Sequence, residues 1–197
     1  MAINAGTTGS AGQVIGTATM TGTITGSDKP TIEATKSATY SCQTTKSYRG
    51  VDGWKSAGRV YQGKFSKSNP SRYNYYGLYV LGTDVINQMK SDLANKTIKS
   101  VKLTIKRNAE GGTDTTGVSV NIYGTTNAGS GTSFPLTKTY KTNAGKIKKG
   151  SSYTITMPNS LVADIIDGTI KSLMLHKPDQ SNYAIFGTTF KLEVTYV

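Results

Sequence analysis

Hydrophobic residues occupy every second position over 101–105 and again over 118–122, with polar residues between them. A period of two predicts β-strands with one buried face. The same pattern predicts further strands at 153–157, 170–176, 183–186 and 190–197. We expect the strands at 101–106 and 118–123 to be neighbours, because the Gly111-Gly112 pair between them is typical of a hairpin-type connection.

Two segments have a helical spacing instead. After Thr83 and Asp84, apolar residues at 85, 86, 89 and 93 form a single stripe. Asn159 and Ser160 precede a second stripe at 161, 162, 165 and 166, and Gly168 follows where a helix is expected to stop. We predict two short helices that close the ends of a β-sandwich.

Residues 1–36 differ from the rest of the chain. Threonine occupies every odd position from 17 to 25, opposite a weakly apolar face. Such a strand cannot bury a core alone, so this segment is predicted to serve attachment or oligomerisation; a flexible tail is the alternative. Residues 37–197 are predicted to form one all-β, jelly-roll-like β-sandwich domain.

Composition supports the all-β prediction and limits the chemistry. The chain has 197 residues, of which 36% are hydrophobic, 17% are charged and 22 are glycine. This mixture favours strands and turns. The single cysteine, Cys42, excludes an intrachain disulfide and a cysteine-rich metal site. We expect no metal and no cofactor.

The net charge of +12 suggests acidic partners. Nucleic acid is not the expected partner, because only four of the 23 basic residues are arginine and the lysines are spread along the chain. A solvated basic surface is the preferred explanation of this charge, and attraction to anionic cell-wall polymers or to an acidic capsid face is the alternative.

The segments that direct a protein to or through a membrane are not evident. The first residues lack the basic and apolar regions of a secretory signal, and no stretch has 18 consecutive apolar residues. We therefore expect a protein made in a cytoplasm, with no membrane partner. Such a product with the composition of an extracellular β-domain is expected of a virion part, which leaves the host by lysis.

An enzyme requires a constellation of reactive groups, and the sequence suggests none. His176 is the sole histidine, and Cys42 has no neighbouring activating group. Asp164 and Asp167 lie three residues apart on the second predicted helix, which is ordinary placement for solvated acids. We predict that the protein is not an enzyme and that Asp164, Asp167 and His176 have no catalytic role.

Aromatic residues give the most specific hint of binding. Four tyrosines fall within positions 73–79, and Trp54 and Tyr61 lie upstream. Aromatic rings can stack on sugars while amide and guanidinium groups bond the hydroxyls. The candidate glycan-binding residues are Trp54, Arg72, Tyr73, Asn74, Tyr75 and Tyr79. Strand alternation puts Tyr73, Tyr75 and Tyr79 on one face and Tyr76 on the other, so at least one set is expected to be core.

The order of several motifs resembles a module found at the C-terminal ends of tail and minor structural proteins from phages of Gram-positive bacteria. The motifs span 38–42, 48–49, 54, 60–63, 77–82, 98–107, 111–112, 168–175, 182–187 and 191–196. The resemblance, which extends to jelly-roll domains of cell-wall proteins, covers roughly residues 38–197. It implies a virion surface module, in some relatives glycan-binding, and supplies no catalytic residue. The residues before position 38 are too few for the large amino-terminal tail-assembly domain of that family, so we expect a capsid location as readily as a tail location.

These observations favour a bacteriophage virion surface protein, either a capsid decoration protein or head fibre, or a tail-associated fibre. Its expected partners are other virion proteins of the capsid or tail, further copies of itself in a homo-oligomer, and host cell-wall polysaccharide. A freestanding carbohydrate-binding module is the first alternative, and a nucleic-acid-binding β-domain is the second.

Overall fold

The structure, a computed structural model, describes residues 33–55, 57–65, 74–113 and 116–197. Residues 34–197 form one compact unit. Its first strand begins at Lys36, so the predicted domain start at residue 37 falls just inside that strand. The prediction for residues 1–36 lies almost wholly outside the described residues.

The unit is built mainly of β-strands, as predicted. In the first half of the chain these are β1 (Lys36–Tyr40), β2 (Thr44–Arg49), β3 (Gly53–Lys55), β4 (Val60–Lys64), β5 (Asn74–Val80) and β6 (Ile98–Arg107). In the second half they are β7 (Val118–Thr125), β8 (Lys138–Ile147), β9 (Ser152–Met157), β10 (Ser172–Leu175) and β11 (Ala184–Tyr196). A 3₁₀ turn, Gly50–Asp52, joins β2 to β3.

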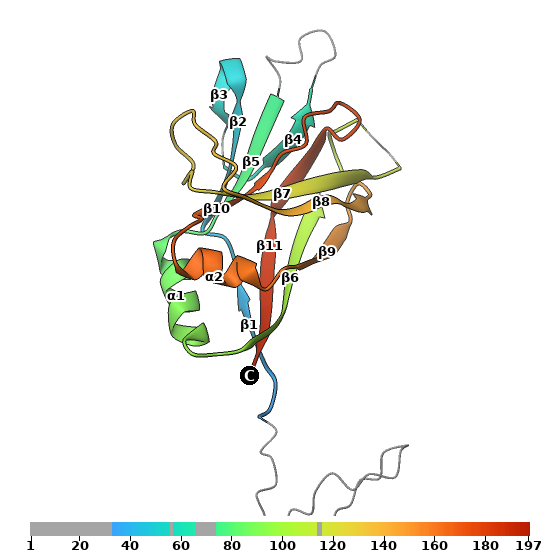
Figure 1. The fold of residues 1–197 in the computed structure, drawn as a ribbon. Helices are drawn as coiled ribbons and strands as arrows, with labels where there is room; N and C mark the ends of the chain where they lie inside the picture. Colours follow the sequence, from blue (N-terminus) through green and yellow to red (C-terminus); the bar gives the residue numbers. More distant parts are fainter. Residues whose placement is uncertain (1–32, 56, 66–73, 114–115) are drawn as a thin grey trace, which may run out of the picture. The chain divides into compact units, whose positions relative to one another are not determined.

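The strands form one antiparallel path, β8-β7-β10-β5-β4-β11-β6-β9, which bends around the core and nearly closes into a barrel (Figure 1). Three of the described strands lie off this path. Strand β1 pairs with β11, and β2 pairs both with β5 and, as a hairpin, with β3. Strand β4 joins the two layers, because Val60–Gln62 pair with β11 while Gly63 and Lys64 pair with β5. The all-β class is confirmed, with one continuous sheet supplying both layers.

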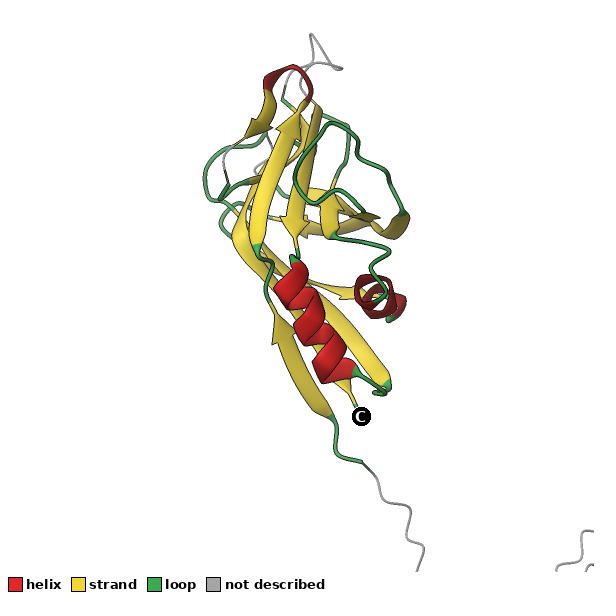
Figure 2. Ribbon diagram, turned by 90° about the vertical axis from the view of Figure 1, so that its left-hand side faces the viewer, coloured by secondary structure: helices red, strands yellow, loops and turns green. Residues whose placement is uncertain are grey.

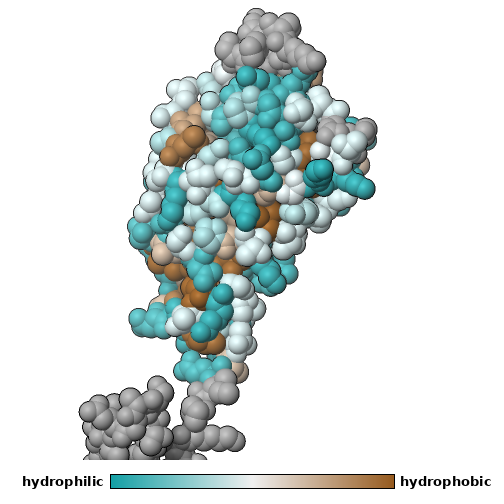
Figure 3. All heavy atoms as spheres, turned by 45° about the vertical axis from the view of Figure 1, so that its right-hand side comes forward, coloured by the Kyte–Doolittle hydropathy of each residue, from teal (hydrophilic) through white to brown (hydrophobic). Residues whose placement is uncertain are grey.

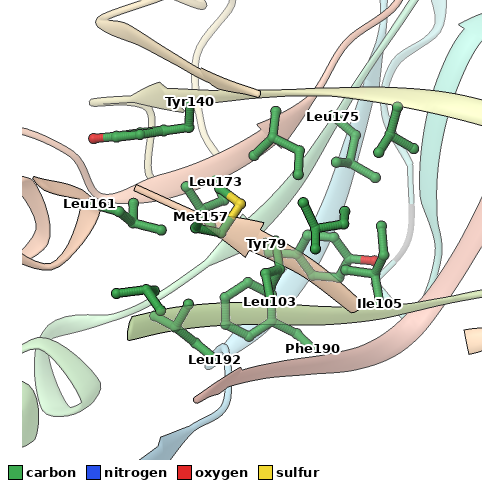
Figure 4. Packing of buried hydrophobic residues seen from close by; sticks show 14 of the residues in the cluster. Tyr79, Leu103, Ile105, Tyr140, Met157, Leu161, Leu173, Leu175, Phe190 and Leu192 are labelled. Carbon is green, nitrogen blue, oxygen red and sulfur yellow. The ribbon is translucent and has the colours of Figure 1, made fainter. Parts of the chain in front are cut away.

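Alternate residues of facing strands meet in the core (Figure 4). Leu103 and Ile105 of β6 and Leu192 of β11 come from one layer, and Leu173 and Leu175 of β10 come from the other. All five are fully buried. The period-two pattern of the sequence is therefore the pattern of this core, since successive side chains of a strand point to opposite faces.

One predicted pairing is wrong. Strands β6 and β7 are not neighbours, because β6 pairs with β9 and β11 while β7 pairs with β8 and β10. The two strands lie in different layers and do not form a hairpin. Both strands have an apolar face that needs covering, and facing each other across the core covers both faces at once.

The two predicted helices are present as α1 (Thr83–Leu93) and α2 (Ser160–Ile166). Both lie in the half of the unit that holds the C-terminus (Figure 2) and contact each other. Met89 and Leu93 of α1 are buried. Gly168, with φ 83°, ends α2 as predicted. The predicted Asn159 cap is replaced by a bond from its Nδ2 to the Ile98 carbonyl.

Candidate functional site

The predicted glycan-binding residues do not share one surface. Tyr75 and Tyr79 project from the inner face of β5, where their exposed fractions are 4% and 0%. Tyr79 packs against Phe190, with 5.1 Å between ring centroids, and belongs to the main core. The assignment of Tyr79 to a ligand site is therefore corrected: burial leaves its ring no surface for a sugar.

Trp54 lies on the opposite, outer face of the same layer. There Tyr48, Trp54, Tyr76 and Phe134 form what we call the outer aromatic cluster, with centroid separations of 4.6–5.6 Å. The Trp54 Nε1 donates a 2.9 Å hydrogen bond to the Gly131 carbonyl. These contacts hold the connection between β7 and β8 against the sheet, so Trp54 has a packing role in this arrangement.

The remaining predicted residues lie at the start of β5. Arg72 and Tyr73 are outside the described residues. Asn74 is half-buried, and its Oδ1 accepts no hydrogen bond from the described part of the chain. The structure therefore does not bring the described members of the predicted set together on one surface.

A stack of three tyrosine rings includes Tyr75 on the inner face of β5. The Tyr61 and Tyr75 rings are 4.8 Å apart and inclined by 18°, and Tyr183 lies 5.9 Å beyond Tyr75. The Arg49 Nη1 donates a 3.0 Å hydrogen bond to the Tyr75 hydroxyl. Burial raises the pKa of both Tyr75 and Tyr183. Tyr61 is the half-buried member of the stack. The neutral ring of Tyr75 packs against the Tyr61 ring and fixes its orientation.

Two hollows adjoin this stack and share Arg59; together we call them the Arg59 groove. The first, of about 550 Å³, is lined by Arg59, Lys106, Asn108, Ala109, Glu110, Gly111, Gly150 and Ile185. The second, of about 510 Å³, is lined by Lys55, Ala57, Gly58, Arg59 and Tyr61. Hydrophilic residues predominate on the face drawn in Figure 3, where hydrophobic residues form smaller separate patches.

Buried hydroxyl groups fix the backbone on which Arg59 and Tyr61 stand. The Ser47 hydroxyl donates to the Arg59 carbonyl and accepts from the Tyr61 backbone N–H, at 3.1 and 2.8 Å. The Thr45 hydroxyl accepts from the Gly58 N–H at 3.0 Å. Because Ser47 and Thr45 are buried in β2, the groove is supported by the sheet.

The groove is basic. Arg59, Lys55 and Lys106 contribute three positive charges, and Glu110 contributes one negative charge. Hydrogen bonding to the Tyr61 hydroxyl raises the pKa of Arg59. A guanidinium beside an aromatic ring can bond hydroxyl or carboxylate oxygens while the ring contacts C–H groups. The arrangement therefore suits a polar, ring-containing ligand such as a sugar.

Sequence reasoning mentioned Tyr61 as an upstream aromatic residue and did not single out Arg59. Arg59 and Tyr61 lie near Lys106 and Ile185 because β4 pairs with β11. In that pairing Tyr61 is opposite Ile185, a residue far away in the sequence. The sequence did contain one signal for this site: Arg59 lies two residues before Tyr61, so both side chains of an extended strand would point to the same face.

The titratable groups weighed for catalysis have structural surroundings. Asp164 accepts hydrogen bonds from Lys138 and Tyr140, at 2.7 and 2.6 Å, and so ties α2 to β8. It is not the solvated acid that we expected, since its side chain is only 16% exposed. Asp167 is exposed and accepts the Thr169 N–H just after α2, and this bonding to Thr169 lowers its pKa.

His176 is buried and Cys42 is half-buried. Burial lowers the pKa of His176 and raises the pKa of Cys42 to about 11. A thiol with a raised pKa is a poor nucleophile at neutral pH. No group of three or more His, Cys, Asp or Glu side chains placed to hold a metal ion occurs within the described ranges.

Comparison with known proteins adds no family. No protein-family model matches the sequence, and no curated protein matches it. Within the part of the chain that the structure describes, no helix is both long and apolar enough to span a membrane.

Proposed function

We propose that this chain is a non-enzymatic binding module on the surface of a bacteriophage particle, and that it contacts host cell-surface glycan through the Arg59 groove. The observation that carries the glycan proposal is the pair of hollows that share Arg59, with Tyr61 held against Tyr75 at their edge. The virion location rests on the motif resemblance over residues 38–197. As a capsid decoration protein, head fibre or tail-associated fibre, the module needs one exposed binding face and one attachment segment.

The groove has the features of a carbohydrate site. Sugar recognition needs an aromatic surface for the C–H face of a ring, and a few directed polar groups for its hydroxyls. Tyr61 supplies the first, while Arg59, Lys55, Lys106 and Glu110 supply donors and an acceptor. Because Tyr61 is held by the stack, little side-chain freedom is lost on binding.

The test measures binding of the purified protein to Gram-positive cell walls and to oligosaccharides released from them. We expect Tyr61→Ala and Arg59→Gln each to weaken binding about tenfold, since one lost contact of this kind costs about 1–3 kcal/mol. Leu136→Ala and Lys102→Gln are the controls, because Leu136 is 52% exposed and Lys102 is exposed, both outside the groove. Equal weakening by the control substitutions would contradict the assignment.

A second measurement separates a virion protein from a freestanding carbohydrate-binding module. Electron microscopy of particles made with and without the protein shows whether density is lost from the capsid, neck or tail. Identical particles together with intact glycan binding would favour the freestanding module.

A further inference from the structure

A third hollow, of about 500 Å³, lies along the edge strand β8 and shares no residue with the Arg59 groove. We call it the Asn143 groove. Its lining residues are Thr116, Gly117, Ser119, Asn143, Gly145, Lys146, Ser181 and Asn182. Strand β8 pairs with β7 and ends the path of the sheet, and the groove extends from β8 to the start of β7 and to residues 181–182.

The backbone opens the groove. Asn143 and Gly145 have φ angles of 50° and 68°, and the register between β7 and β8 shifts at this point. Asparagine is the non-glycine residue that best tolerates such a conformation. A Cβ on Gly145 would lie 2.7 Å from the ring of Tyr153, and one on Gly117 would lie 2.9 Å from the Lys146 backbone. Both positions therefore require glycine, because a side chain would collide with these neighbours.

The hydrogen-bond acceptors in the walls are already used. Lys177 Nζ donates to the Asn143 Oδ1 at 2.7 Å and contacts the Ser119 hydroxyl. The Asn182 Oδ1 accepts from both the backbone N–H and the hydroxyl of Ser119. The carboxylate of Asp179 accepts from Ser181 and Asn182.

Two side-chain hydrogen-bond donors of the groove are unpaired in the described part of the chain. Among the described residues, the Asn143 Nδ2 and the Lys146 Nζ have no hydrogen-bond partner. The surrounding strand and turn, residues 138–149, contain five lysines and no acidic residue. A rigid groove with free N–H donors and excess positive charge attracts an anionic group.

We infer that the Asn143 groove binds the phosphate or carboxylate groups of an acidic polysaccharide. Lys146 and Lys177 supply charge, and Asn143 supplies a directed amide donor. The donors are ammonium and amide groups without arginine, which suits point-charge attraction to acidic groups along a flexible polymer more than the bidentate recognition of bases. This site stands independently of the glycan site at Arg59.

The test uses four probes: dextran phosphate, polygalacturonate, neutral dextran and single-stranded DNA. We expect both acidic polysaccharides to bind more tightly than dextran, and their binding to weaken as salt rises. The double variant Asn143→Gly/Lys146→Gln should weaken this binding about tenfold, the effect of losing a charge-assisted contact. Glycine at 143 keeps the backbone conformation accessible.

The matched control is Asn95→Gly/Lys96→Gln. Asn95 is also exposed with a positive φ of 59°, and Lys96 is an exposed lysine beside it. This control should bind both acidic polysaccharides within about twofold of the parent. Amide NMR signals of Gly117, Ser119 and Gly145 should shift on titration.

Three outcomes would overturn the inference. Equal weakening by the Asn95/Lys96 control would show that only net charge matters. Acidic polymers bound no better than dextran would leave the lysines as protection of an exposed strand edge. DNA bound more tightly than both acidic polysaccharides, and weakened by the groove substitutions, would assign the groove to nucleic acid.

Discussion

His176 joins the two aromatic groups on β5. Its ring stacks on Tyr76 at 4.2 Å, and its Nδ1 lies 3.0 Å from the Tyr75 carbonyl. A carbonyl only accepts hydrogen bonds, so Nδ1 carries a proton and donates it. The side chain is 9% exposed, and burial lowers its pKa, with a smaller contribution from Lys64. The folded protein therefore holds this histidine neutral.

Stability should consequently fall in mild acid. Below the ordinary pKa of 6.5, the unfolded chain binds a proton that the folded chain excludes. The free energy of unfolding should drop by up to about 1.4 kcal/mol between pH 7.5 and pH 5.5, as measured by urea denaturation. His176→Gln keeps a donor for the Tyr75 carbonyl and should remove most of this drop. An unchanged pH dependence in that variant would assign the effect to other groups.

At the residue level, the sequence predicted correctly which side chains are buried when their burial depends on the alternation of a single strand. The alternation at 73–79 predicted that one set of tyrosines is core, and burial of Tyr75 and Tyr79 confirms it. It could not distinguish a binding role for Trp54 from a packing role, because Phe134 and Gly131 come from a distant segment.

At the level of elements, Asn127 organises the long connection between β7 and β8. Its Oδ1 accepts from the N–H groups of Gly129 and Ser130, and its Nδ2 donates to the carbonyls of Ser130 and Ser133. It is only 8% exposed. The segment held in this way presents Gly131 and Phe134 to the outer aromatic cluster.

Asn127→Ala should therefore release this connection from the sheet. We expect a loss of about 1–3 kcal/mol in the free energy of unfolding, since several buried backbone groups lose their partner. Trp54 is the sole tryptophan, so its fluorescence reports the change directly. We expect a red-shifted emission that iodide quenches more readily than in the parent. Emission identical to the parent would show that the aromatic contacts alone hold the connection.

The elements themselves were largely predictable, whereas their pairing was not. The strands at 183–186 and 190–197 are one strand, β11, with a register irregularity between Phe186 and Phe190. Periodicity detects each half, but the bulge between them is set by the partners β4 and β6. The error over β6 and β7 has the same cause, because pairing depends on contacts between distant segments.

At the level of the whole molecule, the compact unit contains every residue that the two proposed grooves require. The unit begins at Ala34, and β1 belongs to it through pairing with β11. Tyr40 at the end of β1 is 2% exposed and its hydroxyl donates to Asp92 of α1. The Arg59 and Asn143 grooves are both built entirely from residues of this unit.

Deleting residues 1–33 should therefore leave folding and ligand binding intact while it abolishes incorporation into particles. The reason is that the alternating threonines at 17–25 cannot bury a core of their own and need a partner surface. Deleting residues 1–40 is the informative comparison, because it also removes β1. Loss of buried Tyr40 alone should then cost about 3–5 kcal/mol, measured by urea denaturation. If the shorter deletion is incorporated as fully as the parent, attachment resides in the β-domain and the role assigned to the amino-terminal segment is wrong.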